Sequence, residues 1–179
     1  MESMADAQGE VERQAKAPAD SSPDAAFLPL DSARWQLAMV WFPSCAVLFL
    51  ILVAQSLGGA YGTQLQRAWG WALPTFLPTL ALMTSVFAAD ALSVRTKSPA
   101  YVRRSFFGLA MGLSLFYLFT VFVSVGAQPF VGMVTAAPDM VVARLELLEL
   151  SNMWLSPLQS MVVAALGVLF FLKEQKDKK

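Results

Sequence analysis

The sequence predicts an all-α, polytopic membrane protein, in which four transmembrane helices form a bundle and both termini are cytoplasmic (N-in/C-in). Three observations predict this class. Hydrophobic residues make up 56% of the chain and charged residues only 15%, whereas soluble domains contain about 25% charged residues. Four long stretches carry no charge. Eleven of the 13 Lys and Arg residues lie in the N-terminal tail, the second connection and the C-terminal end. These three segments all fall on one side of the membrane if the chain crosses it four times.

Residues 1–33 are expected to form a disordered cytoplasmic tail. This stretch is rich in Ala, Ser, Asp, Glu and Pro and has few large apolar residues, so it cannot bury enough surface to offset the entropy of ordering. It is not predicted to be a signal peptide, because it is not basic first and apolar soon after. Asp31 or Ser32 is a candidate N-cap for the first membrane helix.

The four spans are predicted from the charge-free stretches, each of which holds the about 20 residues needed to cross the hydrocarbon. The expected spans are residues 35–57, 69–91, 105–127 and 153–172. Together they form a transmembrane domain over residues 34–173. Four core helices of a soluble bundle are the alternative, but such helices carry about 10–14 apolar residues in a row. No stretch alternates apolar and polar residues as a barrel strand would.

The connections between the spans support this count. The first is rich in Gly, and the second is basic. The third contains an amphipathic segment at residues 139–150, which we expect at the outer interface and continuing into the fourth span. The first and third connections hold one cation each, Arg67 and Arg144. The bias of positive charge therefore places the tail, the second connection and a basic end at residues 174–179 in the cytoplasm.

The fourth span carries a polar stripe. Glu149, Asn152, Ser156, Gln159 and Ser160 share one face at helical periodicity. Because polar side chains that face lipid lack partners, we expect this stripe to face other helices or water. It then serves either interhelical hydrogen bonding, worth about 0.6 kcal/mol per contact, or a hydrated path.

The third span has two opposite faces. Ser114, Tyr117 and Ser124 lie on a polar face, and Gly108 and Gly112 form a GxxxG motif on the other. If the polar face points into the bundle, the glycine face points outward, and we expect self-association through it. Packing of the glycines inside the same chain is the competing interpretation. The polar face and the stripe of the fourth span are the candidate lining of a polar path.

The second span contains Pro74 and Pro78. Each removes a backbone donor and frees a carbonyl one turn earlier, so we expect a kink. Asp90, at the cytoplasmic end of this span, is expected to pair with Arg95 or Arg103. No charge lies in the middle of a predicted span, which argues against proton-coupled or ion-coupled transport.

The residue content argues against most enzyme chemistry. The chain has no His and a single Cys, Cys45, and it lacks the phosphate-loop, serine-hydrolase and zinc-protease motifs. We therefore predict no enzyme activity, no metal and no cofactor. A net charge of zero gives no electrostatic case for binding nucleic acid.

These exclusions favour a non-catalytic, multi-pass subunit of the cell membrane. Its expected partners are the lipid bilayer and either further copies of the chain, in a homo-oligomer, or another membrane protein. An oligomeric pore or membrane effector is one form of this function. The alternative is a small transporter or channel for a neutral or weakly polar solute. A membrane enzyme that uses Glu146 and Glu149 as paired carboxylates is a third possibility.

Overall fold

The computed structural model describes residues 27–92, 100–130 and 140–171, and these are mostly helical. The elements in chain order are β1 (Phe27–Pro29), α2 (Leu30–Leu57), the 3-10 helix η2 (Gly62–Gln64), α3 (Leu65–Leu92), β2 (Tyr101–Arg103), α4 (Arg104–Gly126), the 3-10 helix η3 (Gln128–Phe130) and α6 (Met140–Phe171). Within these described ranges, four helices are long and apolar enough to cross a membrane. The predicted number of helices of that length and composition is therefore confirmed.

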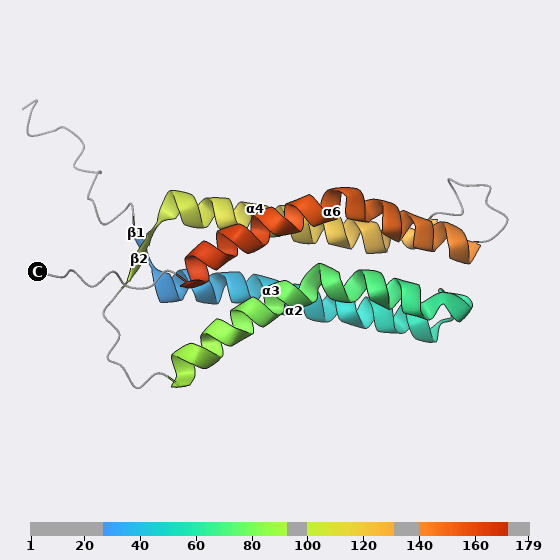
Figure 1. The fold of residues 1–179 in the computed structure, drawn as a ribbon, viewed down its shortest axis with the longest axis horizontal. Helices are drawn as coiled ribbons and strands as arrows, with labels where there is room; N and C mark the ends of the chain where they lie inside the picture. The colour runs from blue at the N-terminus through green and yellow to red at the C-terminus, as the bar shows by residue number, and fades with distance from the viewer. Residues whose placement is uncertain (1–26, 93–99, 131–139, 172–179) are drawn as a thin grey trace, which may run out of the picture.

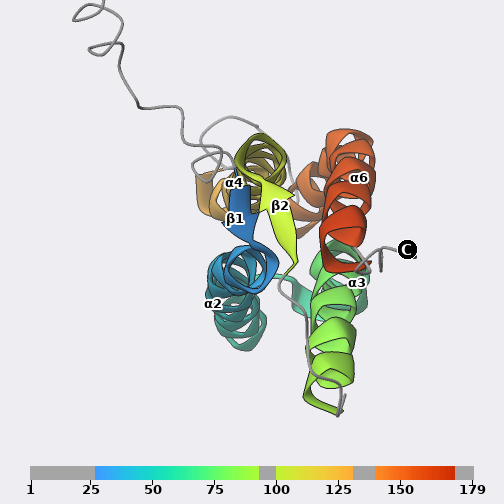
Figure 2. The same cartoon turned by 90° about the vertical axis from the view of Figure 1, so that its left-hand side faces the viewer.

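The helices lie side by side along one long axis (Figure 1). Helices α2 and α4 run away from the end that carries β1 and β2, and α3 and α6 run back toward it. Seen from that end, α2 and α6 each lie beside both α3 and α4, so that α3 and α4 occupy diagonal positions (Figure 2). Strand β1, with which the described chain begins, and the C-terminal end of α6 therefore lie at the same end of the bundle.

A short sheet at this end was not predicted. Strands β1 and β2 pair in antiparallel fashion, with Leu28 opposite Val102, and the Leu30 amide extends the pairing by donating to the Ala100 carbonyl at 2.9 Å. Helix α2 then begins at Leu30. The stretch assigned to a disordered tail therefore ends earlier than expected, since its residues from 27 onward are strand and helix. The sheet connects the starts of α2 and α4 across this end of the bundle.

The turn after α2 explains why this helix ends at Leu57. Gly59 has a φ of 72°, a conformation that residues with a side chain rarely adopt. The Gly59 amide donates to the Ser56 carbonyl at 3.2 Å, and the Ala60 amide donates to the Gln55 carbonyl at 2.9 Å. These two bonds are the Schellman arrangement, which satisfies the last carbonyls of a helix and reverses the chain toward α3.

Helix α3 changes direction near its middle, and its C-terminal half diverges from the bundle (Figure 1). Pro74 and Pro78 both lie inside this helix, in agreement with the expected kink. Helix α6 is continuous from Met140 to Phe171, so the predicted outer segment and the fourth span belong to one helix. The first residue of that segment, Asp139, and the basic end at residues 174–179 lie outside the described residues.

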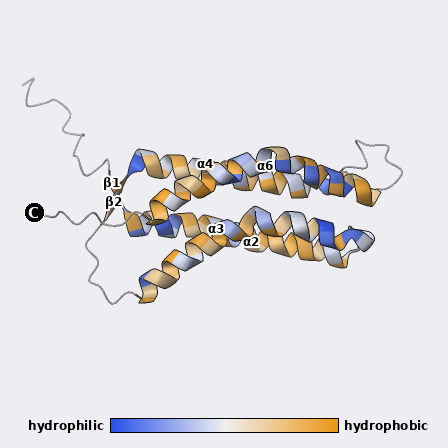
Figure 3. Cartoon of the chain, viewed as in Figure 1, coloured by the Kyte–Doolittle hydropathy of each residue, from blue (hydrophilic) through white to orange (hydrophobic). Residues whose placement is uncertain are grey.

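Apolar side chains occupy both the interior and the surface of the bundle. Large buried residues from all four helices form one core, including Trp41, Met83, Tyr117 and Leu166. Many equally apolar residues point outward along the full length of the helices, while hydrophilic residues concentrate toward the two ends (Figure 3).

Candidate functional site

The polar face of the third span points into the bundle. Ser114, Tyr117 and Ser124 are all buried in α4. The Tyr117 hydroxyl donates to the Thr75 carbonyl of α3 at 2.6 Å, and its ring stacks on Trp41 of α2 with 5.8 Å between centroids. Ser124 donates to the Thr120 carbonyl of its own helix at 2.9 Å. The polar face therefore links three helices through Tyr117.

The polar stripe of the fourth span has a different position. Asn152 and Ser156 are exposed on α6, as are Glu149 and Ser160. The face of α6 that packs inward includes Ser151, Leu155, Val162 and Leu166, which lies about 100° around the helix from the stripe. The six predicted path residues therefore do not line one interior path, because those on α4 are buried and most of those on α6 lie at the surface.

Gln159 is the member of the stripe that contacts another helix. Its Nε2 donates to the Pro74 carbonyl of α3 at 2.7 Å. In an unbroken helix this carbonyl would accept the amide of residue 78, but residue 78 is proline and has no N–H. Gln159 thus replaces the backbone bond that Pro78 removes, and it ties α6 to the kink of α3.

The glycine face of α4 points outward, as the opposition of faces predicted. Gly108 and Gly112 are both exposed. A Cβ built at either position meets no other atom within 4 Å. Neither glycine is therefore needed for packing within the described part of the chain.

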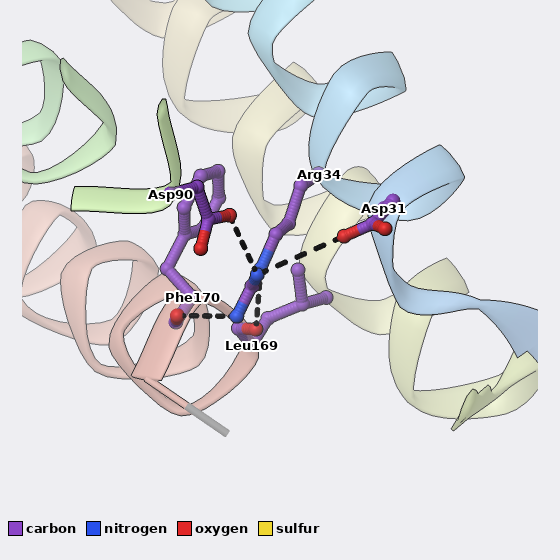
Figure 4. A network of polar contacts seen from close by, with 5 residues as sticks. All are labelled: Asp31, Arg34, Asp90, Leu169 and Phe170. Carbon is purple, nitrogen blue, oxygen red and sulfur yellow. Dashed lines mark hydrogen bonds and ion pairs between the residues drawn. The ribbon is translucent and has the colours of Figure 1, made fainter. Parts of the chain in front are cut away.

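Arg34 of α2, which sequence reasoning did not single out, lies at the centre of a network of polar contacts (Figure 4). The residue is only 8% exposed. Its Nη2 donates to the Phe170 carbonyl at 2.6 Å and its Nε to the Leu169 carbonyl at 3.4 Å. Its Nη1 lies 3.3 Å from Asp90 of α3 and 4.0 Å from Asp31. One guanidinium therefore joins the ends of three helices.

This network gives Asp90 a partner that the sequence did not suggest, Arg34. The expected pairing was with Arg95 or Arg103; Arg95 lies outside the described residues, so that pairing stays a prediction. The last carbonyls of a helix lack intrahelical donors and carry the negative end of its dipole. Arg34 is suited to this position, because its five donors contact two carbonyls and a carboxylate at once.

A second polar cluster lies at the opposite end of the bundle. The hydroxyl of Tyr61, a buried residue, contacts Gln55 and Gln128, with 2.9 Å to the Gln128 oxygen. Because a phenol has one proton, Tyr61 can donate to only one of these two oxygens at a time. Burial raises the pKa of Tyr61, and the Gln128 hydrogen bond and the charge of Arg144 oppose this shift. Arg144 also donates to the Ala60 carbonyl at 3.2 Å.

The carboxylates considered for enzyme chemistry lie at this end on the surface. Glu149 accepts from Arg67 at 2.6 Å, and Glu146 is exposed. Among the described residues, no group of three or more His, Cys, Asp or Glu side chains is placed to hold a metal ion. The arrangement of both polar ends connects helices, and it presents no nucleophile beside a base in the described part of the chain.

Comparisons with protein-family models, curated proteins and solved structures give no match for this chain.

Proposed function

We propose that this chain is a non-catalytic, multi-pass protein of the cell membrane that works by assembling with further copies of itself through α4. The proposal has three parts: insertion of the four helices into lipid, orientation with both termini in the cytoplasm, and association through the glycine face. Each part has its own support.

Insertion is supported by the apolar surface. Leu50 of α2 and Phe119 of α4 are each 65% exposed, and Met161 of α6 is 55% exposed. Soluble monomers rarely expose continuous apolar surface of this extent, whereas lipid chains solvate it well. The charged groups near the ends of the bundle, such as Arg34 and Arg67, would then lie near the headgroups.

Orientation is supported by the distribution of Lys and Arg together with the antiparallel arrangement of the helices. The arrangement brings β1 and the C-terminal end of α6 to the same end of the bundle. The basic segments adjoin that end in sequence, and basic flanks favour the cytoplasm.

Association is supported by one observation above all, the unobstructed glycine face of α4. Gly108 and Gly112 leave the helix surface flat and open, so the backbone of a second helix can approach closely. The same face also exposes Leu115 and Phe119, which would pack beside the contact. Helix association in lipid depends on such close packing, because apolar burial gives no driving force there.

The exposed stripe of α6 supports a pore as one form of this assembly. In a single copy, the Asn152 amide and the Ser156 hydroxyl would face lipid, where polar groups are costly. Copies that turn α6 toward a common axis would give these side chains water or one another as partners.

The assembly is tested by cross-linking the full chain in membranes and by native mass measurement in detergent. Replacing both glycines by leucine (Gly108→Leu with Gly112→Leu) is expected to convert oligomers to monomers. Gly70→Leu on α3 is the matched control, because a Cβ there also meets nothing within 4 Å and oligomers should persist. Unchanged oligomer size in the double variant would refute association through this face.

A further inference from the structure

Three polar side-chain atoms in the middle of the bundle have no hydrogen-bond partner among the described residues. They are Trp41 Nε1, Thr79 Oγ1 and Ser114 Oγ. All three residues are 0% exposed. Burying such a group without a partner is unfavourable, and most buried polar groups in proteins have a partner.

Thr79 and Ser114 lie at a similar depth. The hydrogen bond from the Tyr117 hydroxyl to the Thr75 carbonyl sets Tyr117 of α4 and Thr75 of α3 at about the same depth along the bundle axis. Thr79 is one turn beyond Thr75, about 6 Å along α3, and Ser114 is about 4.5 Å from Tyr117 along α4. Since the two helices run in opposite directions, both steps lead toward the end that carries the sheet.

Trp41 lies at this depth as well. Helices α2 and α4 begin at the two ends of the paired strands, at Leu30 and Arg104, and both begin at the same end of the bundle. Trp41 is eleven residues into its helix and Ser114 is ten residues into α4. The stacking of Trp41 on Tyr117 confirms that the two side chains meet.

The hydroxyls of Thr79 and Ser114 do not bond each other. Helices α3 and α4 are diagonal in the bundle, and Tyr117 needs the whole length of its ring to reach the α3 backbone. A serine or threonine hydroxyl ends one bond beyond Cβ. Two such side chains therefore do not span the distance between the diagonal helices α3 and α4. One water molecule with a hydrogen bond of about 2.8 Å on each side covers such a separation.

We propose that one internal water molecule binds between Trp41, Thr79 and Ser114. Its oxygen accepts the Trp41 Nε1–H, and its two protons go to Thr79 Oγ1 and Ser114 Oγ. Three hydrogen bonds are the usual number for a buried water. The water joins α2, α3 and α4 directly beside the kink of α3, where Pro74 and Pro78 have removed two backbone bonds. This inference does not depend on the proposed assembly.

Bound water is detected by radiolytic labelling of the full chain in ¹⁸O-water, where radicals formed from an internal water oxidise the side chains beside it. We expect ¹⁸O incorporation at Trp41 and Tyr117 although both are buried. The double variant Thr79→Val with Ser114→Ala should lose it. Absence of label in the wild type, or label that persists in the double variant, overturns the proposal.

The change in the folding equilibrium constant caused by Thr79→Val is a second readout. Its sign distinguishes a site that binds water from a dry site. If water is bound, Thr79→Val should lower the folding equilibrium constant about tenfold, because the water loses a partner, and Thr79→Ser should restore it. Thr120→Val is the control, since its hydroxyl bonds only within α4. If the site is dry, Thr79→Val removes an unsatisfied group, and an unchanged or higher constant would contradict the proposal.

Discussion

Arg34, near the start of the first long helix, donates to the carbonyl of Phe170, next to the last described residue of the fourth, at 2.6 Å. The two residues are 136 positions apart in sequence. The same guanidinium lies 5.9 Å from the centre of the Phe170 ring. Arg34 therefore makes both a hydrogen bond to the backbone of Phe170 and a cation–π contact with its ring. The contact closes the bundle at the end where both ends of the described chain lie.

Replacing this arginine should loosen the closed end. In Arg34→Gln, the carbonyls of Leu169 and Phe170 and the Asp90 carboxylate lose their shared donor, so we expect a loss of about 2 kcal/mol of unfolding free energy. Unfolding of the protein in detergent micelles measures it. Arg104→Gln, at an exposed position, should change stability by less than about 0.5 kcal/mol. Equal effects of the two substitutions would contradict a special role for Arg34.

The opposite end should depend on the Tyr61 hydroxyl. Tyr61→Phe removes the group between Gln55 and Gln128, which should cost about 1 kcal/mol. Because burial raises the pKa of Tyr61 in the folded protein, its contribution to stability is fully present below the unfolded pKa of about 10. It is lost as pH rises through the folded pKa.

Unfolding free energies measured from neutral pH to about pH 11 check this dependence. The wild type should lose stability above about pH 10, and Tyr61→Phe should lose less over the same interval. Identical slopes for the two proteins would show that Tyr61 titrates in the same way in the folded and unfolded chains.

The kink of α3 offers a double-mutant test. Gln159→Leu should cost about 0.6 kcal/mol, because the Pro74 carbonyl loses its donor. Pro78→Ala restores a backbone N–H that can take this role, so Gln159→Leu in that background should cost little. Unfolding of the four proteins in micelles gives the coupling energy. Additive effects would show that Gln159 does not replace the missing backbone bond.

The number of long apolar helices could be predicted from the sequence, because a long stretch without charged residues is compatible with few structures other than a helix that spans a membrane. Periodicity also grouped the residues of α4 correctly, with Tyr117 buried and Gly112 exposed. It could not orient α6. Asn152 and Ser156 share a face, but which face turns inward depends on the neighbours, and here Ser151 and Leu155 face the core.

The contacts of Arg34 and the sheet were also beyond sequence reasoning. A single arginine before an apolar stretch looks like a topology signal, and only the fold brings it to the Leu169 and Phe170 carbonyls. The pairing of Leu28 with Val102 joins two three-residue strands, which are too short to show an alternating pattern.

The central claim is that the chain crosses a membrane four times with both termini in the cytoplasm. Single thiols introduced as Ser22→Cys, Thr63→Cys or Lys178→Cys in a Cys45→Ala background can be labelled with a membrane-impermeant maleimide. In intact cells only the Thr63→Cys protein should react, and the other two should react after permeabilisation. Reaction of the Ser22→Cys and Lys178→Cys proteins from opposite sides, or protein that stays in solution without detergent, would contradict the claim.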